Sequence, residues 1–333
     1  MKHKNIAIFV PHAGCPYRCS FCDQHVITSQ QILPRAEDVR RICTQAFSEI
    51  ADRSETEIAF FGGSFTAIPR AYMRELLDAA QPFARDCKGI RISTRPDCID
   101  REVLGILKSS RVNTIELGAQ SMCDRVLALN DRGHTAQDIR DASNLIREFG
   151  FELGLQIMPG LYGSTPQDDR DTISEVRTIH PDTVRIYPVV ILNGTRLGEL
   201  YAAGEYRPIP FEEMIALVAE FLCSLMEDGI RIIKVGLHAS EFVEQDALGG
   251  YYHPAFRELC ESEIYKSRIE AEIARLGARD VTLSVHPSCV SKAVGQKRSN
   301  LRYFYDTYKI RVRVVGDASV PAYTIKIKEQ ACI

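Results

Sequence analysis

Short runs of β-branched and other apolar residues alternate with amphipathic segments throughout the first 235 residues of the chain. In the amphipathic segments, such as 39–50 and 73–83, apolar residues recur at three- and four-residue intervals, as a helix requires. Such alternation predicts βαβ units and a parallel sheet. We expect strands at Ile6–Val10, Ile58–Phe61, Ile90–Ser93, Thr114–Leu117, Leu153–Ile157 and Val184–Tyr187, with a seventh candidate at Ile230–Val235.

Polar or glycine-rich residues come directly after several of these strands. Their positions help to distinguish an open sheet from a barrel. The segments are Gly62-Gly63-Ser64, Arg95-Pro96-Asp97, Gly118-Ala119-Gln120 and Met158-Pro159-Gly160. An open doubly wound sheet would concentrate functional residues near one switch point. Polar residues at the carboxyl ends of many strands instead suit a barrel with its active site at the mouth. We therefore expect an α/β fold with a partial TIM-like barrel of six βα units, or a full one.

Composition limits the class of protein only loosely. The chain has 333 residues, enough for one large α/β domain and a smaller one, and a net charge of −3 gives no global attraction to nucleic acid or anionic membranes. No apolar run approaches the roughly 18 residues of a membrane span. The basic N-terminus precedes a run too short for a signal peptide, without a cleavage site. These features predict a cytoplasmic protein with no membrane association.

Three of the eleven cysteines form a group, because Cys15, Cys19 and Cys22 follow the first expected strand at Cys-x3-Cys-x2-Cys spacing. The odd total and the lack of a secretory signal argue against a disulfide framework, and most of the other cysteines are expected in the core. A cubane iron–sulfur cluster normally takes four cysteines, so three would leave one iron open. His25 leaves a second interpretation open, a Cys3His zinc site.

Together with the six βα units and Gly62-Gly63, the cysteine motif resembles the radical S-adenosylmethionine (SAM) superfamily. In that family three cysteines hold a 4Fe–4S cluster, and the amine and carboxylate of SAM chelate the fourth iron. One electron cleaves SAM, and the resulting 5′-deoxyadenosyl radical abstracts hydrogen from a substrate. The resemblance implies that Cys15, Cys19 and Cys22 are the cluster ligands. It also implies a one-electron donor of the flavodoxin or ferredoxin type.

The resemblance further implies a group of residues that bind SAM. Phe21 stands directly before the last cysteine, where the family places an aromatic ring near the adenine. The segment Gly62-Gly63-Ser64 has an ordinary interpretation as a turn after a strand. Its functional interpretation is that glycine lets backbone carbonyls approach the ammonium group of SAM unobstructed.

Polar residues after later strands resemble the coproporphyrinogen-oxidase and Elongator branch of the superfamily. The similarity covers Gly118–Ser121, Arg132–His134 and Gln156–Gly160, where matching residues of that branch contact the ribose or the methionyl carboxylate. Ser93 occupies a position where that branch often has a carboxylate. Taken singly, each of these residues could be an ordinary strand-end polar group. The full set implied at the cofactor is Phe21, Gly62, Gly63, Ser64, Ser93, Arg95, Gln120, Arg132 and Gln156.

Within that branch, the chain is most similar to the radical domain of the tRNA-modifying Elongator protein 3 family. The shared segments are Phe60–Thr66, Ser93–Asp97, Ile115–Ser121 and Arg185–Pro188. The compact cysteine spacing departs from the longer first interval of that family. Because the chain ends at Ile333, we expect it to lack the acetyltransferase domain. The resemblance therefore implies a transferase-like enzyme acting on tRNA or another RNA, but not the acetyl-CoA-dependent chemistry.

The sequence predicts two domains, a core barrel over residues 1–240 and a small α+β domain over 241–333. In the second, a long helix, a strand, two helices around a turn and a further strand follow in order, with a last strand near Tyr323–Ile327. This order resembles the core of a KH domain, whose GxxG loop clamps a nucleic-acid backbone, although an arginine replaces the second glycine. The alternative is an ordinary helical hairpin with a solvated basic face. The expected RNA contacts are Lys292, Gly295, Lys297, Arg298 and Arg302.

The sequence thus predicts a radical SAM enzyme with a 4Fe–4S cluster that takes part in tRNA or RNA modification. Two alternatives stay open at this point. One is the same chemistry on a small molecule, and the other is a non-catalytic, zinc-bearing RNA-binding protein. The substrate, the product, the hydrogen-donor atom, a separate acetyltransferase partner and the oligomeric state are not predicted.

Overall fold

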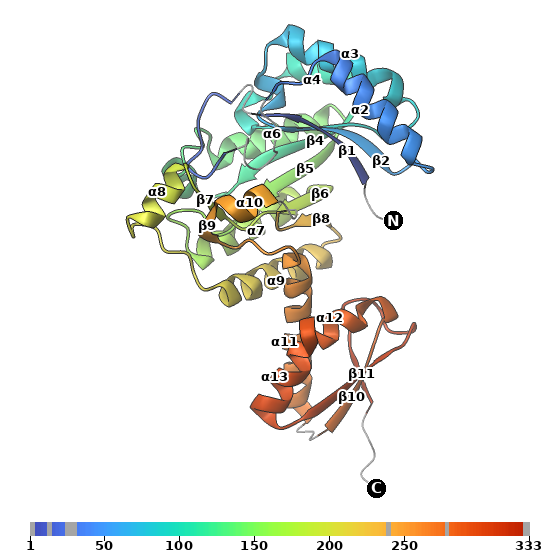
Figure 1. Ribbon diagram of the computed structural model, residues 1–333, viewed down its shortest axis with the longest axis vertical. Coiled ribbons are helices and arrows are strands. Elements are labelled where there is room, and N and C mark those ends of the chain that lie inside the picture. The colour runs from blue at the N-terminus through green and yellow to red at the C-terminus, as the bar shows by residue number, and fades with distance from the viewer. Residues whose placement is uncertain (1–3, 12–14, 24–31, 238–240, 277–279, 329–333) are drawn as a thin grey trace. The chain divides into compact units, whose positions relative to one another are not determined.

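The computed structural model describes residues 4–11, 15–23, 32–237, 241–276 and 280–328 of the chain. It contains two compact units (Figure 1). The larger unit runs to Ile209 and resumes over Leu225–Tyr252, and the smaller unit comprises Pro210–Ser224 and the chain from His253. The division at residue 240 into separate domains stays a prediction.

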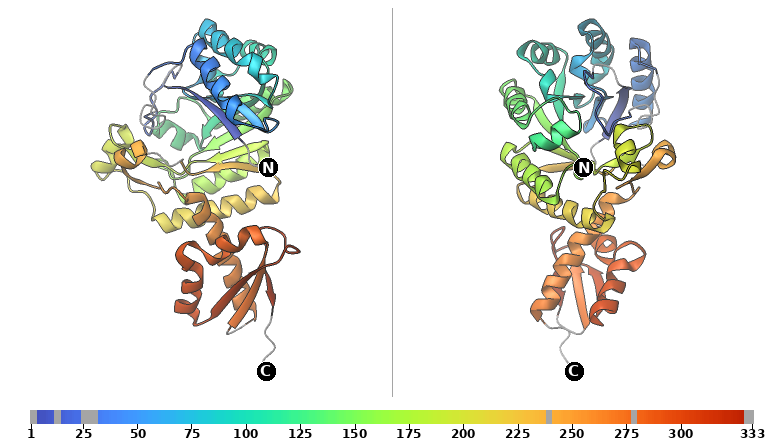
Figure 2. Two further views of the ribbon diagram at one scale, coloured as in Figure 1. Left: turned by 45° about the vertical axis from the view of Figure 1, so that its right-hand side comes forward. Right: turned by 90° about the vertical axis from the view of Figure 1, so that its left-hand side faces the viewer.

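The larger unit is built on one sheet of seven parallel strands, which stand in the order β1-β2-β3-β4-β5-β6-β8. The chain therefore moves always in the same direction across the sheet, and no switch point arises. The sheet curls into a half barrel (Figure 2), which confirms the predicted partial TIM-like barrel. The strands are β1 (Lys4–Val10), β2 (Thr56–Gly62), β3 (Gly89–Thr94), β4 (Val112–Gln120), β5 (Glu152–Ile157), β6 (Thr183–Ile186) and β8 (Arg231–Val235).

Helices cover the outer, convex face of this sheet (Figure 2). Each buries one apolar stripe, as Ile139 and Ile146 do in α6. Side chains fix the N-termini of α6 and α7, where Thr135 and Thr165 form reciprocal capping boxes. The helices of this unit are α2 (Ala36–Glu49), α3 (Arg70–Ala84), α4 (Arg101–Ser109), α5 (Asp124–Leu129), α6 (Ala136–Glu148), α7 (Pro166–Ile179), α8 (Arg196–Ala202) and α10 (Glu241–Asp246).

A two-stranded antiparallel sheet joins β7 (Val190–Leu192) to β9 (Ala247–Gly250). Sequence patterning predicted a turn-rich break at 249–254, and the structure differs in that its first part is a strand. Gly250 has φ of +85°, and a Cβ there would lie 2.5 Å from the carbonyl oxygen of Val189. The glycine is thus required for close backbone approach within a strand pair. In the sequence such a glycine cannot be distinguished from a turn glycine.

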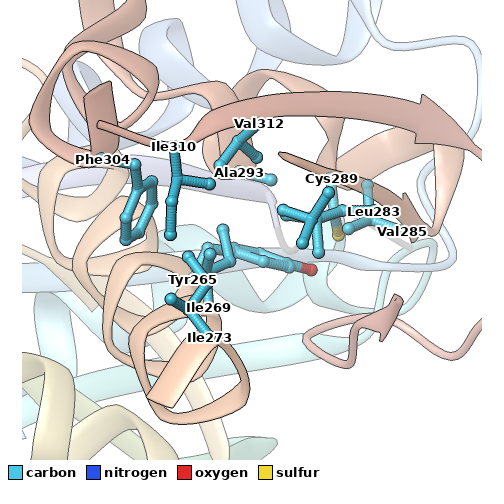
Figure 3. Packing of buried hydrophobic residues seen from close by; sticks show 11 residues of the cluster. Tyr265, Ile269, Ile273, Leu283, Val285, Cys289, Ala293, Phe304, Ile310 and Val312 are labelled. Atoms are coloured by element: carbon cyan, nitrogen blue, oxygen red, sulfur yellow. The ribbon is translucent and has the colours of Figure 1, made fainter. Parts of the chain in front are cut away.

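The smaller unit contains a three-stranded sheet in the order β11-β10-β12, in which β11 is parallel and β12 antiparallel to β10. The predicted order of strand, two helices and strand is confirmed, while the last described strand begins at Lys326, later than predicted. Figure 3 shows residues of α11, β10, α13 and β11 packed into one core, among them Tyr265, Leu283 and Phe304. The elements are α11 (Phe256–Leu276), β10 (Asp280–Val285), α12 (Val290–Val294), α13 (Ser299–Tyr308), β11 (Arg311–Gly316) and β12 (Lys326–Lys328), and α9 (Phe211–Glu227) has residues in both units.

The scattered cysteines are less often buried than the sequence predicts. Cys43, Cys260 and Cys289 are buried, whereas the other four described ones are half-buried. Cys332 lies outside the described residues. Of these four, Cys223 lies in α9, whereas Cys87, Cys98 and Cys123 lie outside the α-helices and strands.

Candidate active site

A cavity of about 640 Å³ lies on the inner face of the half barrel, near the carboxyl ends of its strands. The structure brings the three clustered cysteines and every residue predicted at SAM to the wall of this one cavity. Their individual binding roles stay predictions. The residues are Cys15, Cys19, Cys22, Phe21, Gly62, Gly63, Ser64, Ser93, Arg95, Gln120, Arg132 and Gln156.

The cysteine segment is anchored through Ser20, which is buried between its neighbours. The backbone N–H of Ser20 donates to the carbonyl of Asn130, and its hydroxyl donates to Asn130 Oδ1 at 2.7 Å. The N–H of Leu197, in α8, donates to the carbonyl of Ser20 at 2.8 Å. The segment is therefore tied both to the end of α5 and to the start of α8. His25, the fourth ligand of the zinc alternative, lies outside the described residues.

The protonation and spacing of the thiols bear on what they can bind. Burial raises the pKa of Cys15 and of Cys22, and the neighbouring thiols raise the pKa of Cys22 further. Metal binding must therefore displace protons at neutral pH. Within the described part of the chain, no three His, Cys, Asp or Glu side chains are grouped around the position of a single ion.

Arg132 lies against the cysteines and is almost completely buried. Its Nη1 donates to Cys19 Sγ at 3.0 Å, and its Nη2 donates to the carbonyl of Gly118 at 2.5 Å. The guanidinium also lies 6.0 Å from the ring centroid of Phe21. The remaining nitrogen, Nε, is buried and has no hydrogen-bond partner among the described residues. A buried cation with a free donor beside thiols suits a site that holds negative charge.

Arg95 repeats this arrangement from the end of β3. It makes a paired contact with Asp97, at 2.9 and 3.0 Å, and donates to the carbonyl of Arg132. Its guanidinium lies 5.0 Å from the ring centroid of Tyr17. Its Nη1 is buried with no partner in the described chain. These two orphaned donors fit an anionic cluster with bound carboxylate.

The turn after β2 is shaped by glycine. Gly62 has φ of +114°, and a Cβ there would lie 2.7 Å from the carbonyl oxygen of Val10. The N–H of Gly63 donates to that same carbonyl at 2.9 Å, which folds the turn tightly over the end of β1. Ser64 is buried and shares a hydrogen bond of 2.8 Å with the Thr94 hydroxyl, linking the ends of β2 and β3. The turn therefore presents bare backbone to the cavity.

A β-bulge directs Gln120 into the cavity. The pairing of β4 with β5 shifts between Gly118 and Gln120, which leaves Ala119 as the extra residue, and Gln120 takes φ of +68°. Gln156 Nε2 donates to Gln120 Oε1 at 3.4 Å. The two amides, far apart in sequence, form one polar edge of the cavity.

The inner face also carries a buried charge network that sequence reasoning missed. Glu116 accepts hydrogen bonds from Arg185 at 2.6 Å, from Arg91 at 3.4 Å and from the Ser93 hydroxyl at 3.3 Å. Arg91 also pairs with Glu57 at 2.8 Å. A signal was available, because each charged residue interrupts an otherwise apolar strand run and so must face inward with a partner. Other cavity-lining residues that were not predicted include Tyr17, Arg18, Phe61, Met158, Tyr187 and Lys234.

The residues predicted to contact RNA fall into two groups. Lys297, Arg298 and Arg302 are exposed, next to Gly295, at the turn that leads into α13. Lys292 instead pairs with Glu261 at 2.8 Å and donates to the hydroxyl of Tyr323 at 3.2 Å. Lys292 therefore has a partner within its own unit, whereas Lys297, Arg298 and Arg302 are exposed to solvent.

Comparison with known protein families decides the class of the site. The Radical SAM superfamily model matches residues 9–176, and the Radical_SAM C-terminal domain model matches residues 181–266. The chain belongs to the radical SAM superfamily. It is an enzyme of this type, and its cofactors are a 4Fe–4S cluster and SAM. The thiols, orphaned arginine donors and bare glycine turn described above fit both groups.

The relatives of this radical SAM protein support the predicted branch. An uncharacterised protein of Methanocaldococcus jannaschii is 30% identical over 219 residues, 65% of either chain. The tRNA uridine(34) acetyltransferase of Dehalococcoides mccartyi is 26% identical, over 69% of this chain and 58% of the relative. The structure of archaeal Methanocaldococcus infernus Elp3 with an N-terminal deletion has the same fold, with a TM-score of 0.56 at 22% identity over 74% of this chain and 62% of that one.

The resemblance to the radical region of the Elongator protein 3 family is therefore confirmed. The chain spans less than two thirds of the length of these relatives, so it shares a region with them rather than their whole architecture. None of the helices in the described ranges is long and apolar enough to cross a membrane.

Proposed function

We propose that this radical SAM enzyme modifies tRNA or another RNA. The observation that supports the radical SAM chemistry is that the three cysteines and all nine residues predicted at SAM line one cavity. The RNA part is supported by similarity to a tRNA uridine(34) acetyltransferase. When bound, the cluster and SAM supply one-electron cleavage of SAM and abstraction of hydrogen from a substrate.

The residues of the cavity would divide the binding work between them. Cys15, Cys19 and Cys22 would hold the cluster, and Arg132 would neutralise part of its negative charge through the Cys19 sulfur. The bare Gly62-Gly63 turn would accept the ammonium group of SAM at its backbone carbonyls.

The remaining predicted residues would orient the rest of SAM. Arg95 has a buried free donor for a carboxylate, and the edge formed by Gln120 and Gln156 offers amide groups for the ribose hydroxyls. Phe21 would lie along the adenine. The Ser93 hydroxyl donates a hydrogen bond to Glu116. We therefore assign Ser93 to the part of the cavity wall that would contact the substrate.

The inner face beyond the cofactor residues is the proposed place for the reacting nucleotide. It is lined by Phe61, Arg185, Tyr187 and Lys234, which combine aromatic surface with hydrogen-bond donors. Burial raises the pKa of Tyr187, so its hydroxyl keeps its proton and can donate. A flavodoxin or ferredoxin would deliver the electron, and a cytoplasmic location stays a prediction.

Anaerobic reconstitution tests the cluster. We expect about four irons per chain and dithionite-dependent 5′-deoxyadenosine from the native chain. Cys19→Ala should lose iron and cofactor cleavage, whereas Cys223→Ala, in α9 and outside the cavity, should retain both. Zinc without iron in the native chain would contradict the proposal.

Mass spectrometry of nucleosides tests the substrate. RNA from a strain that lacks the gene should have lost one modified nucleoside, and the native gene, but not Cys19→Ala, should restore it. Unchanged RNA, combined with cofactor cleavage by the pure enzyme, would refute the RNA part and leave a small molecule as substrate.

A further inference from the structure

One side of α13 carries basic and aromatic side chains that the cavity does not use. Arg298 at the N-cap, Arg302, Tyr305 and Lys309 at the C-cap follow each other at spacings of four, three and four residues. Helical spacing places Arg302 and Tyr305 on one side of the helix, and Arg298 and Lys309 flank them at its two ends. All four are exposed, and Tyr305 has 50% of its surface open to solvent. These residues form what we term the α13 stripe.

The opposite side of α13 holds the helix in place. Phe304 is fully buried in the core of this unit (Figure 3). Asn300 is buried too, and its Nδ2 donates to the carbonyls of Ser262 at 3.0 Å and Ala293 at 3.2 Å. The fold of the unit therefore depends on the buried side of α13 and does not require the α13 stripe.

The cations of the α13 stripe make no ion pair within the described part of the unit. Within the described ranges, Arg298, Arg302 and Lys309 have no carboxylate partner, in contrast to the paired Lys292. The chain as a whole has a net charge of −3, so this local excess of positive charge does not follow from composition. Asp306 borders the stripe as the acidic residue of α13.

The aromatic ring of the stripe is set among these cations. Lys309 Nζ lies 5.8 Å from the ring centroid of Tyr305, and its ammonium donates to the carbonyl of Asp306, which fixes it beside the ring. Lys297 and Arg298 both take left-handed backbone conformations, with φ of 49° and 63°. Such conformations persist only where the surrounding structure holds them. Here they form the tight turn that leads into α13.

We propose that the α13 stripe binds a single-stranded segment of RNA, with its cations on phosphates and the Tyr305 ring stacked on a base. An exposed ring flanked by unpaired cations matches what single-stranded nucleic acid offers, alternating charge and planar bases. An acidic protein surface would use the charges but not the ring. This inference rests on the RNA part of the proposed function and adds a place where the RNA is held.

Binding of a labelled short oligouridine to the full chain, measured by fluorescence anisotropy, tests the stacking. Tyr305→Ala should weaken binding about ten-fold or more, since one stacked base contributes that much. Tyr305→Phe keeps the ring and should bind like the native chain. Equal oligouridine binding by Tyr305→Ala and the native chain would overturn the proposal. It would also be overturned if Tyr305→Ala weakened heparin binding as much as oligouridine binding, because heparin has no bases.

The salt dependence tests the phosphate contacts. Arg302→Gln should reduce the slope of log affinity against log salt by about 0.7, the value for one phosphate contact on a single strand. The control is Arg275→Gln in α11, which is also exposed but is paired with Glu272, and it should leave the slope unchanged. Equal slopes for Arg302→Gln and Arg275→Gln would also overturn the proposal.

The same variants separate this inference from the proposed function. Cofactor cleavage without RNA should be unchanged in all of them, because the α13 stripe contributes nothing to the cavity wall. If the native chain restores the lost nucleoside in the deletion strain but no stripe variant changes oligouridine binding, the stripe is refuted and the function stands. If no nucleoside is lost from the deletion strain, the function itself fails.

Discussion

Removing the charge of Glu116 tests the physical role of the buried network inside the half barrel. Glu116 is 2% exposed and accepts hydrogen bonds from Arg185, Arg91 and Ser93. Glu116→Gln keeps the shape of the side chain but leaves Arg185 without its carboxylate at 2.6 Å. Arg91 retains Glu57. The variant therefore removes the carboxylate from one buried cation and leaves the other paired.

Breaking a buried ion pair from one side costs about 3–5 kcal/mol, because the remaining charge stays desolvated. Against a typical unfolding free energy of about 5–15 kcal/mol, such a loss is large. With a urea dependence of about 3 kcal/mol per molar, it corresponds to a fall in the unfolding midpoint of at least about 1 M.

Urea unfolding of the cofactor-free, reduced protein, followed by far-ultraviolet circular dichroism, measures this midpoint. The matched control is Glu148→Gln, which breaks the Arg101–Glu148 pair of 2.7 Å on the surface, where both side chains are more than half exposed. That pair is screened by water, so its loss should leave the midpoint unchanged. If Glu116→Gln lowers the midpoint no more than Glu148→Gln, the network does not stabilise the barrel and the reasoning is wrong.

Two further predictions concern the turn after β2 and a buried acid. Gly62→Ala should lower both SAM affinity and the thermal midpoint, because its Cβ would lie 2.7 Å from the Val10 carbonyl at φ of +114°; Gly105→Ala, with nothing within 4 Å, should raise the midpoint instead. Burial raises the pKa of Asp169 to about 6, so the folded state holds this proton more tightly and stability should fall as pH rises from about 4 to about 6. Asp169→Asn should flatten that dependence in thermal scans, and an unchanged slope would contradict the assignment.

Local sequence was sufficient for the strands, the helices and the strand-end polar residues. Seven strands were predicted because each apolar run is bounded by polar or glycine-rich segments, and these boundaries are properties of neighbouring residues. The cysteine group and Gly62-Gly63 were likewise visible, since their chemistry depends on residue type and short spacing. The β9 strand was missed because the glycine that permits close approach resembles a turn glycine.

The ion-pair partners of charged residues could not be predicted where the two residues lie on different strands. The charges of Arg91, Glu116 and Arg185 were visible in the sequence, but their pairing depends on the register between β3, β4 and β6. The same holds for Lys292, whose basic character predicted an RNA contact. The structure pairs it with Glu261 of α11, and its RNA contact stays a prediction.

By itself, the sequence determined that this chain forms a parallel βα array with three clustered thiols at the end of its first strand. Only the tertiary structure decided that Arg132 donates to Cys19 and that Glu116 pairs with Arg185 inside the barrel. It also decided that Arg302 and Tyr305 face outward while Lys292 is paired. The reason is physical, since periodicity follows from local backbone geometry, whereas curvature, register and burial follow from contacts between residues far apart in the chain.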